Sequence, residues 1–136
     1  MTKQIDFSKY AIFVDGVTSD SSKDYKSFLD RIEYLDGEGS NIQRLLTAAV
    51  GISAEGGEFM EIVKKMLFQG KPWNDDNREH LIIELGDVLW YVMQACKALD
   101  VSIEEVVAGN VDKLKKRYPG GEFNVYQSEN RKEGDL

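Results

Sequence analysis

The sequence has 136 residues, the length of one ordinary domain, and its 42% hydrophobic and 30% charged residues are typical of soluble globular proteins. Its formal net charge of −7 argues against general nucleic-acid binding, which depends on basic surface. One cysteine, Cys96, and one histidine, His80, exclude an intrachain disulfide and a metal site built from several of these residues. Without a signal peptide or a run of 18 apolar residues, we expect a cytoplasmic protein that does not enter a membrane.

The first part of the chain predicts two helices. Residues 7–17 carry apolar side chains at steps of three and four, which favours a short helix capped by Asp6. The adjacent Ile12 and Phe13 also permit a strand there. A polar loop is expected over residues 18–22, and a second helix follows, with its apolar residues between positions 25 and 35.

A long third helix is predicted from about residue 41 to residue 69. It contains Gly51, Gly56 and Gly57, and Gly86 lies in the next helix. Each glycine in a helix interior costs up to about 1 kcal/mol relative to alanine. Such glycines are explained where another backbone or a ligand comes very close, and close helix–helix packing is the simpler of these explanations.

Two further helices follow. The next loop contains Pro72, which makes a continuous helix through it unfavourable. A fourth helix is predicted from about residue 76 to residue 99. Residues 102–105 have the pattern of a capping box and begin a fifth helix, which Pro119 ends.

These elements predict an all-α fold, a bundle of four or five helices. We expect residues 1–121 to form a single domain and the polar residues 122–136 to form a C-terminal arm that is loose or lies on a neighbouring subunit. The fourth helix is apolar on more than one face, so a bundle this small cannot cover it. We therefore expect an oligomerising protein, a homodimer or a homotetramer, in which residues of a neighbouring subunit line part of each pocket.

Two acidic pairs, Glu55-x-x-Glu58 and Glu84-x-x-Asp87, lie on the third and fourth helices. Residues three apart share one helix face, about 5–6 Å apart at Cβ. Either pair alone is more often a solvated face, but Glu55 and Glu84 fall on apolar stripes that should face the core. A carboxylate removed from water without a partner costs several kcal/mol, and Mg²⁺ or Mn²⁺ is the simplest compensation. The pairs therefore predict a metal site inside a helical bundle.

The acidic pairs and their spacing resemble the signature of the MazG-like all-α nucleoside triphosphate pyrophosphohydrolases. So does the fifth-helix pattern Asn110-x-x-Lys113-Leu114-x-x-Arg117-Tyr118-Pro119-Gly120-Gly121. The resemblance covers roughly residues 40–121, and residues 18–24 and 67–73 resemble short, single-domain members, some of them phage-encoded. It implies hydrolysis of (deoxy)nucleoside triphosphates to the monophosphate and pyrophosphate by a metal-activated water. The implied cofactor is Mg²⁺, for which Mn²⁺ can substitute.

The resemblance also implies roles for individual residues. Four carboxylates would bind the metal: Glu55, Glu58, Glu84 and Asp87. One of them, for which we choose Glu58, would also accept the proton of the attacking water. Six residues are expected to contact the substrate: Lys71, Trp73, Tyr91, Asn110, Lys113 and Arg117.

Each substrate-contacting residue also has a simpler explanation. Lys113 and Arg117 lie four apart on one face with Asn110, which suits phosphate oxygens, but a basic helix end also suits the helix dipole. Tyr91 would contact phosphate or sugar, or belong to the core. Trp73 would stack on a base, or fill the bundle.

The sequence leaves the base undetermined. Resemblance to short phage-type members favours a deoxynucleoside triphosphate, with dGTP or GTP as first choice and dCTP, dUTP or phosphoribosyl-ATP as alternatives. A di-iron or di-manganese carboxylate bundle is disfavoured because neither acidic pair ends in histidine. A non-enzymatic interaction module is disfavoured because Glu55 and Glu84 lie on core stripes.

Overall fold

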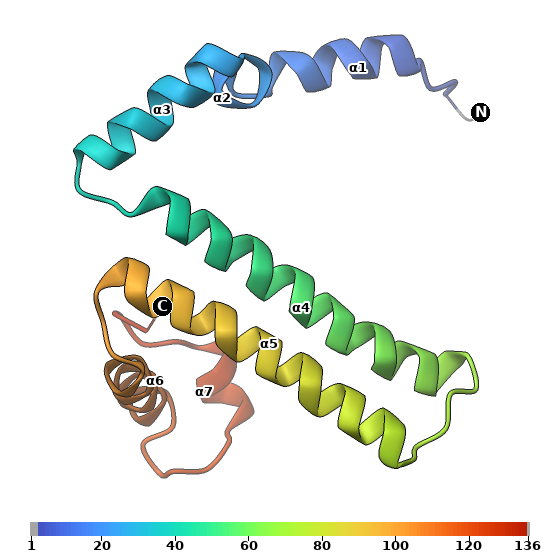
Figure 1. Cartoon of the computed structure of the whole chain (residues 1–136), viewed down its shortest axis with the longest axis vertical. Helices are drawn as coiled ribbons and strands as arrows, with labels where there is room; N and C mark the ends of the chain where they lie inside the picture. The colour runs from blue at the N-terminus through green and yellow to red at the C-terminus, as the bar shows by residue number, and fades with distance from the viewer. Residues whose placement is uncertain (1–2, 136) are drawn as a thin grey trace. The chain divides into compact units, whose positions relative to one another are not determined.

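The computed structural model describes residues 3–135, which form seven α-helices and no strand (Figure 1). The expected all-α class is therefore confirmed. The five predicted helices are α1 (Phe7–Gly16), α3 (Tyr25–Gly37), α4 (Ile42–Phe68), α5 (Asp75–Leu99) and α6 (Ile103–Arg117). Two short helices were not predicted, α2 (Asp20–Lys23) and α7 (Val125–Glu129). The strand alternative at Ile12 and Phe13 is wrong, because both residues lie within α1.

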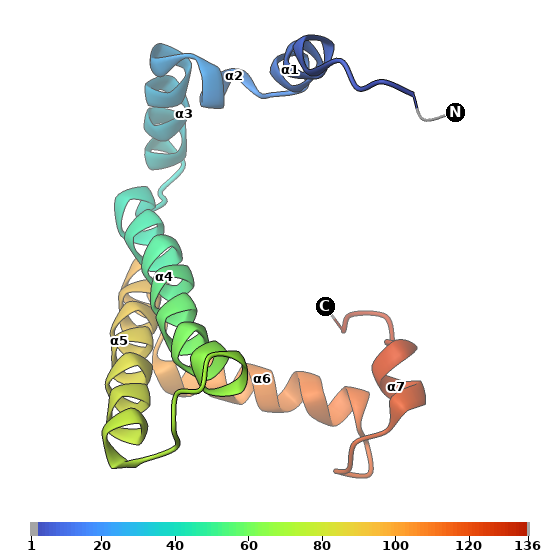
Figure 2. The same ribbon diagram turned by 90° about the vertical axis from the view of Figure 1, so that its right-hand side faces the viewer.

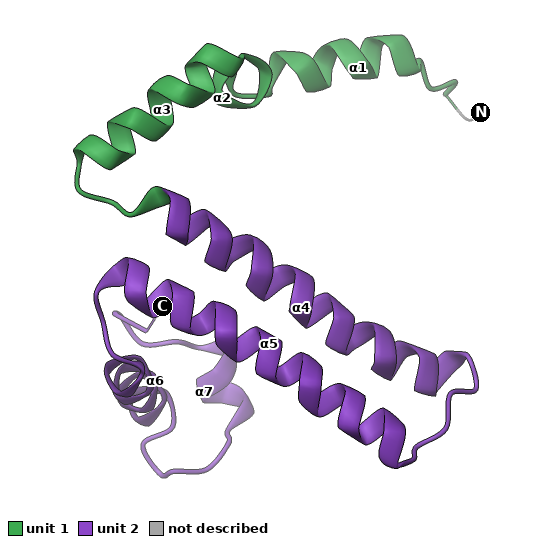
Figure 3. Ribbon diagram, viewed as in Figure 1, with its two compact units in different colours: residues 1–42 green, residues 43–136 purple. Residues whose placement is uncertain are grey.

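The chain divides into two compact units, residues 1–42 and residues 43–136 (Figure 3). The first contains α1 to α3, and the second contains nearly all of α4 together with α5 to α7. The boundary lies inside the stretch 1–121 that we treat as one domain in the sequence.

Side-chain caps fix where the helices of the first unit begin. The carboxylate of Asp6 accepts hydrogen bonds from the backbone N–H groups of Ser8 and Lys9 at the start of α1, as predicted. Asp24 does the same for Ser27 at the start of α3. The predicted polar loop at residues 18–22 is partly wrong, because α2 begins at residue 20.

Helices α4 and α5 form an antiparallel hairpin in the second unit (Figures 1 and 2). Its loop is fixed by two asparagines. Asn74 caps α5 by accepting from the backbone N–H of Asn77 at 2.9 Å, and the buried Nδ2 of Asn77 donates to the carbonyl of Pro72 at 2.6 Å. At the other end, the backbone N–H of Lys71 donates to the carbonyl of Lys65 at 3.1 Å, so the loop that carries Lys71 and Trp73 is held at both ends.

The hairpin packs closely at one glycine. Gly51 is buried, and a Cβ added there would overlap the ring of Tyr91 on α5. At Gly56, Gly57 and Gly86, by contrast, an added Cβ would meet no atom within 4 Å. Close approach between helices thus explains Gly51 and leaves the other three glycines unexplained within this chain.

Helix α6 begins beside the end of α5 and leads away from the hairpin (Figure 2). Ser102 caps it by accepting from the backbone N–H of Glu105 at 3.1 Å, as the capping box predicts. The described part of the arm carries α7 and returns to α6, where Asp135 pairs with Arg117. This charged pair ties the end of the described arm to α6, and the division into a domain and a C-terminal arm stays a prediction.

The hairpin leaves much apolar surface uncovered. Only three hydrophobic side chains among the described residues are buried: Ala48, Ile62 and Cys96. Large apolar residues of α5 are 44% to 57% exposed: Ile82, Ile83, Leu85, Leu89, Trp90 and Met93. In the described part of the chain, every helix is too short or too polar to serve as a membrane-spanning segment.

Candidate metal centre

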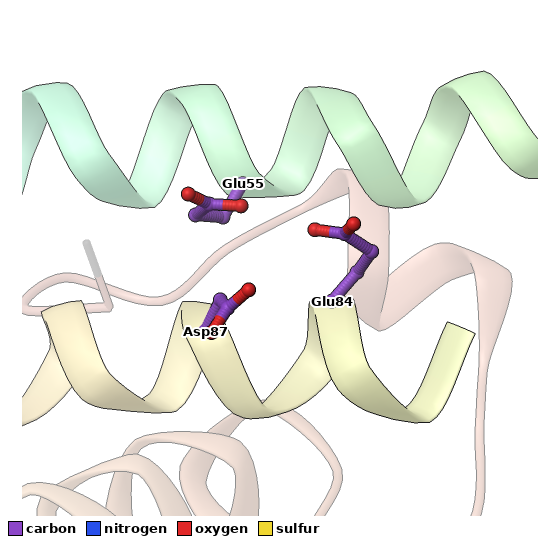
Figure 4. A group of neighbouring side chains, drawn as sticks. All are labelled: Glu55, Glu84 and Asp87. Carbon is purple, nitrogen blue, oxygen red and sulfur yellow. The ribbon is translucent and has the colours of Figure 1, made fainter. Parts of the chain in front are cut away.

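Three carboxylates meet between the helices of the hairpin. Glu55 points from α4 towards Glu84 and Asp87 on α5 (Figure 4). Each offers one oxygen, and these oxygens all lie within 4.8 Å of one another. We call these three residues the acidic cluster. Glu55 and Glu84 are half-buried and Asp87 is exposed, so the cluster is open to solvent on one side.

The apolar stripes of the two helices place the cluster. On α5, Glu84 belongs to a stripe at steps of three and four residues that is half-buried throughout: Leu81, Glu84, Val88, Tyr91 and Ala95. On α4, Glu55 is half-buried, whereas Ile52, three residues before it, is 37% exposed. Because the helices are antiparallel, Gly51, one turn before Glu55, packs on Tyr91, one turn after Asp87. This contact keeps the helices close where the acids meet.

Negative charge accumulates in the cluster. Burial raises the pKa of Glu55 above the ordinary value for a glutamate, and a hydrogen bond with Glu84 raises it further. The charges of Asp87, Glu84 and Glu58 add to the same shift. No cation is among the causes of this shift.

His80 contacts the cluster from outside. Its Nε2 lies 3.1 Å from Oε1 of Glu84, one turn along α5, and the side chains are 51% and 13% exposed respectively. The contact of His80 with Glu84 is not among the sequence predictions. The spacing of four residues is the signal that points to it.

Glu58 lies outside the acidic cluster. Three helical steps leave it about 60° around the axis from Glu55, and its side chain is exposed. It still contributes to the raised pKa of Glu55, so it lies close enough to act on the cluster electrostatically. Its roles as ligand and catalytic base stay predictions.

The residues expected to contact substrate are distributed over three places. Tyr91 is half-buried against Gly51, in keeping with the core alternative. In the hairpin loop, Lys71 is half-buried and Trp73 is 69% exposed.

The third place is α6, where Asn110 is exposed and Lys113 half-buried. Arg117 donates two hydrogen bonds to Asp135, at 2.7 Å and 2.8 Å. Neither cation of α6 is among the causes of the shifted pKa of Glu55. Their contact with substrate stays a prediction.

The donor set of the cluster fits a hard divalent cation. Its three ligand atoms are carboxylate oxygens, which suit Mg²⁺ or Mn²⁺, and no cysteine or histidine belongs to the group. A cation held there would also relieve the repulsion that raises the pKa of Glu55. Among the described residues, Glu55, Glu84 and Asp87 thus form a group whose carboxylates could hold such an ion.

Comparison with known proteins identifies the family. The MazG nucleotide pyrophosphohydrolase domain matches residues 43–121, more than half of the chain, and all ten predicted site residues lie in that range. The gene 37 protein of Mycobacterium phage L5 is 37% identical over 86 residues, which are 62% of this chain and 75% of the phage protein. No solved structure matches the chain significantly. The protein belongs to the MazG nucleotide pyrophosphohydrolase family.

Proposed function

We propose that this protein hydrolyses (deoxy)nucleoside triphosphates to the monophosphate and pyrophosphate in a Mg²⁺-dependent reaction. The observation that carries the proposal is the acidic cluster, whose oxygens converge within 4.8 Å in a chain of the nucleotide pyrophosphohydrolase family. A triphosphate is a polyanion, so bare carboxylates would repel it. A bound cation is what makes the cluster compatible with such a substrate.

Glu55, Glu84 and Asp87 would hold the metal, with Glu58 as a further ligand from α4. When bound, Mg²⁺ or Mn²⁺ neutralises phosphate charge and lowers the pKa of a coordinated water. Glu58 lies on α4 outside the cluster, and its side chain is exposed to solvent. We assign its carboxylate the role of accepting a proton from this water. Replacement of Glu58 by Gln is therefore expected to lower kcat by about 10²–10⁴.

The remaining residues would bind the nucleotide. Asn110, Lys113 and Arg117 of α6 would hold phosphate oxygens, and Tyr91 would contact phosphate or sugar. The exposed Trp73, on the fixed hairpin loop beside Lys71, offers a surface for base stacking. We keep dGTP or GTP as first choice of substrate, with dCTP, dUTP and phosphoribosyl-ATP as alternatives.

A panel of nucleoside triphosphates, incubated with the full chain and Mg²⁺, tests the activity. We expect equimolar monophosphate and pyrophosphate, rather than diphosphate and orthophosphate. Replacement of Asp87 by Asn should lower kcat/KM by at least about 100-fold. Glu61→Gln is the matched control, because Glu61 pairs with Lys64 and Lys65 on the surface of α4.

Two results would contradict the proposal. One is the absence of turnover of every triphosphate with Mg²⁺ and with Mn²⁺. The other is a D87N variant as active as E61Q, since the cluster would then have no part in the reaction.

We further propose that the protein is a homodimer or homotetramer. The exposed apolar side chains of α5 support this, because full burial of each contributes about 1.5–3 kcal/mol. Light scattering during size-exclusion chromatography measures the mass directly. A mass of 15.4 kDa at micromolar concentration would refute the proposal.

A further inference from the structure

The most completely buried ion pair among the described residues lies far from the acidic cluster in sequence. Arg117, the last residue of α6, donates from Nε to one oxygen of Asp135 at 2.7 Å and from a terminal nitrogen to the other at 2.8 Å. The two side chains are 11% and 1% exposed, whereas each of the ion pairs of Lys26, Lys64, Lys65 and His80 has at least one side chain that is 44% or more exposed. This is the two-pronged geometry in which arginine binds carboxylate or phosphate.

Further cations act on the carboxylate of this pair. Arg117 holds the pKa of Asp135 well below its usual range, and the charges of Lys113 and Arg131 lower it further. Three cations thus act on a single carboxylate. A phosphate group carries more negative charge than Asp135, and would satisfy the same cations better.

The arm turns at a glycine on either side of its helix. Gly121, before α7, has a φ of 75°, and Gly134, next to Asp135, has a φ of 85°. Other residues rarely adopt this left-handed conformation, so glycine is required at both places. Between them the arm contains only the five residues of α7 as regular structure.

We propose that residues 122–135 act as a latch, in which Asp135 occupies the position at Arg117 that phosphate oxygens of the substrate would take. Closure of the latch and phosphate binding at Arg117 then exclude each other. This inference rests on the proposed function in one respect, the role of Arg117 as a phosphate ligand. It adds that the protein carries its own competitor for that position.

Exchange is chemically easier than simple opening. If Asp135 merely left, Arg117 would lose two charge-assisted hydrogen bonds. If phosphate replaces Asp135, the guanidinium keeps two such bonds and the carboxylate returns to water. Without an oxyanion the latch is therefore mostly closed, and an oxyanion shifts it towards the open form.

Hydrogen exchange on the full chain tests the latch without turnover. Inorganic tripolyphosphate, added to the metal-free protein, should increase amide exchange within residues 122–135. Asp135→Asn keeps the size of the side chain and removes its charge, and should bind tripolyphosphate about tenfold more tightly if the latch is closed nine-tenths of the time. Glu133→Gln is the control, since it removes the same charge from an exposed position in the same arm.

In the turnover assay, D135N should lower KM for the triphosphate while kcat does not fall, and E133Q should match the wild type. Melting curves of both variants establish that they are folded. Unchanged exchange in the arm, with equal tripolyphosphate affinity of D135N and E133Q, would refute the latch and leave Arg117 as an anchor. If the wild type hydrolyses triphosphates and D135N has the KM of E133Q, the latch is wrong and the proposed function stands. If no triphosphate is hydrolysed but tripolyphosphate still opens the arm, the latch stands and the proposed function fails.

Discussion

The contact of Gly51 with Tyr91 makes a sharp prediction, because it lies one turn from the acidic cluster on both helices. In Gly51→Ala the new methyl group would fall on the Tyr91 ring. The overlap includes the base of the ring at Cγ, so either the half-buried Tyr91 side chain or the two helices must move. We predict that α4 and α5 separate locally. Glu55 would then move away from Glu84 and Asp87, and the cluster would lose its convergence.

The expected change in the free energy of unfolding of G51A follows from two opposing effects. Alanine in place of glycine stabilises a helix interior by up to about 1 kcal/mol. Overpacking a close contact costs about 1–3 kcal/mol. Gly109→Ala, in α6, gains the first effect without the second, because an added Cβ there meets no atom within 4 Å. The two variants should therefore differ by about 1–3 kcal/mol, or about 4–12 °C in Tm for a chain of this size.

Thermal melts and Mn²⁺ titration of both variants provide the assay. G51A should bind Mn²⁺ at least about tenfold more weakly than G109A, because its ligands no longer meet. The double variant of Gly51→Ala with Tyr91→Ala should recover part of both losses, since the ring is what the methyl group meets. If the G51A variant has the same Tm and the same Mn²⁺ affinity as the G109A variant, then α4 and α5 are not held together at this contact.

Two further predictions concern neighbours of the metal. The raised pKa of Glu55 means that the folded protein binds the proton of this carboxyl group more tightly than the unfolded chain does. Protonation of Glu55 therefore contributes its full stabilisation of the fold below the ordinary pKa of 4.5. That stabilisation is lost as the pH rises through the raised pKa. In the presence of a chelator at pH 7, the Glu55→Gln variant should accordingly have a higher Tm than the wild type, and the two Tm values should converge near pH 4. A lower Tm for E55Q than for the wild type at pH 7 would contradict this. His80→Ala removes the contact that orients Glu84, and should weaken Mn²⁺ binding about tenfold with little change in Tm, because His80 is half exposed. Unaltered Mn²⁺ affinity in H80A would leave the histidine without a role at the site.

Most of the helices could be predicted from short-range patterns in the sequence. Asp6 and Ser102 were recognisable as helix caps, since capping depends on a few neighbouring residues, and both caps are present. The acidic cluster was predictable for a similar reason. Glu84 and Asp87 share one helix, and a short loop makes α5 run antiparallel to the helix that carries Glu55.

What could not be predicted depends on contacts between distant residues. Nothing in the local sequence indicates that Asp135 reaches Arg117, eighteen positions away, so the arm was expected to be loose or to lie on another subunit. The one-turn helix α2 was missed because serines and aspartate favour loops and helix starts equally. Gly51 was distinguishable from Gly56 only once Tyr91 was placed against it.

The acidic residues and the basic residues of the predicted site are positioned by different structural elements. The acidic cluster needs only the packing of α4 on α5, whereas Lys113 and Arg117 belong to α6 and to the arm that pairs with it. Substitutions that are far apart and share no partner usually act independently. Asp135→Asn should therefore leave Mn²⁺ affinity unchanged, and Gly51→Ala should leave tripolyphosphate binding to the metal-free protein unchanged. A change in both affinities from either substitution would mean that the two groups already form one site in the absence of substrate.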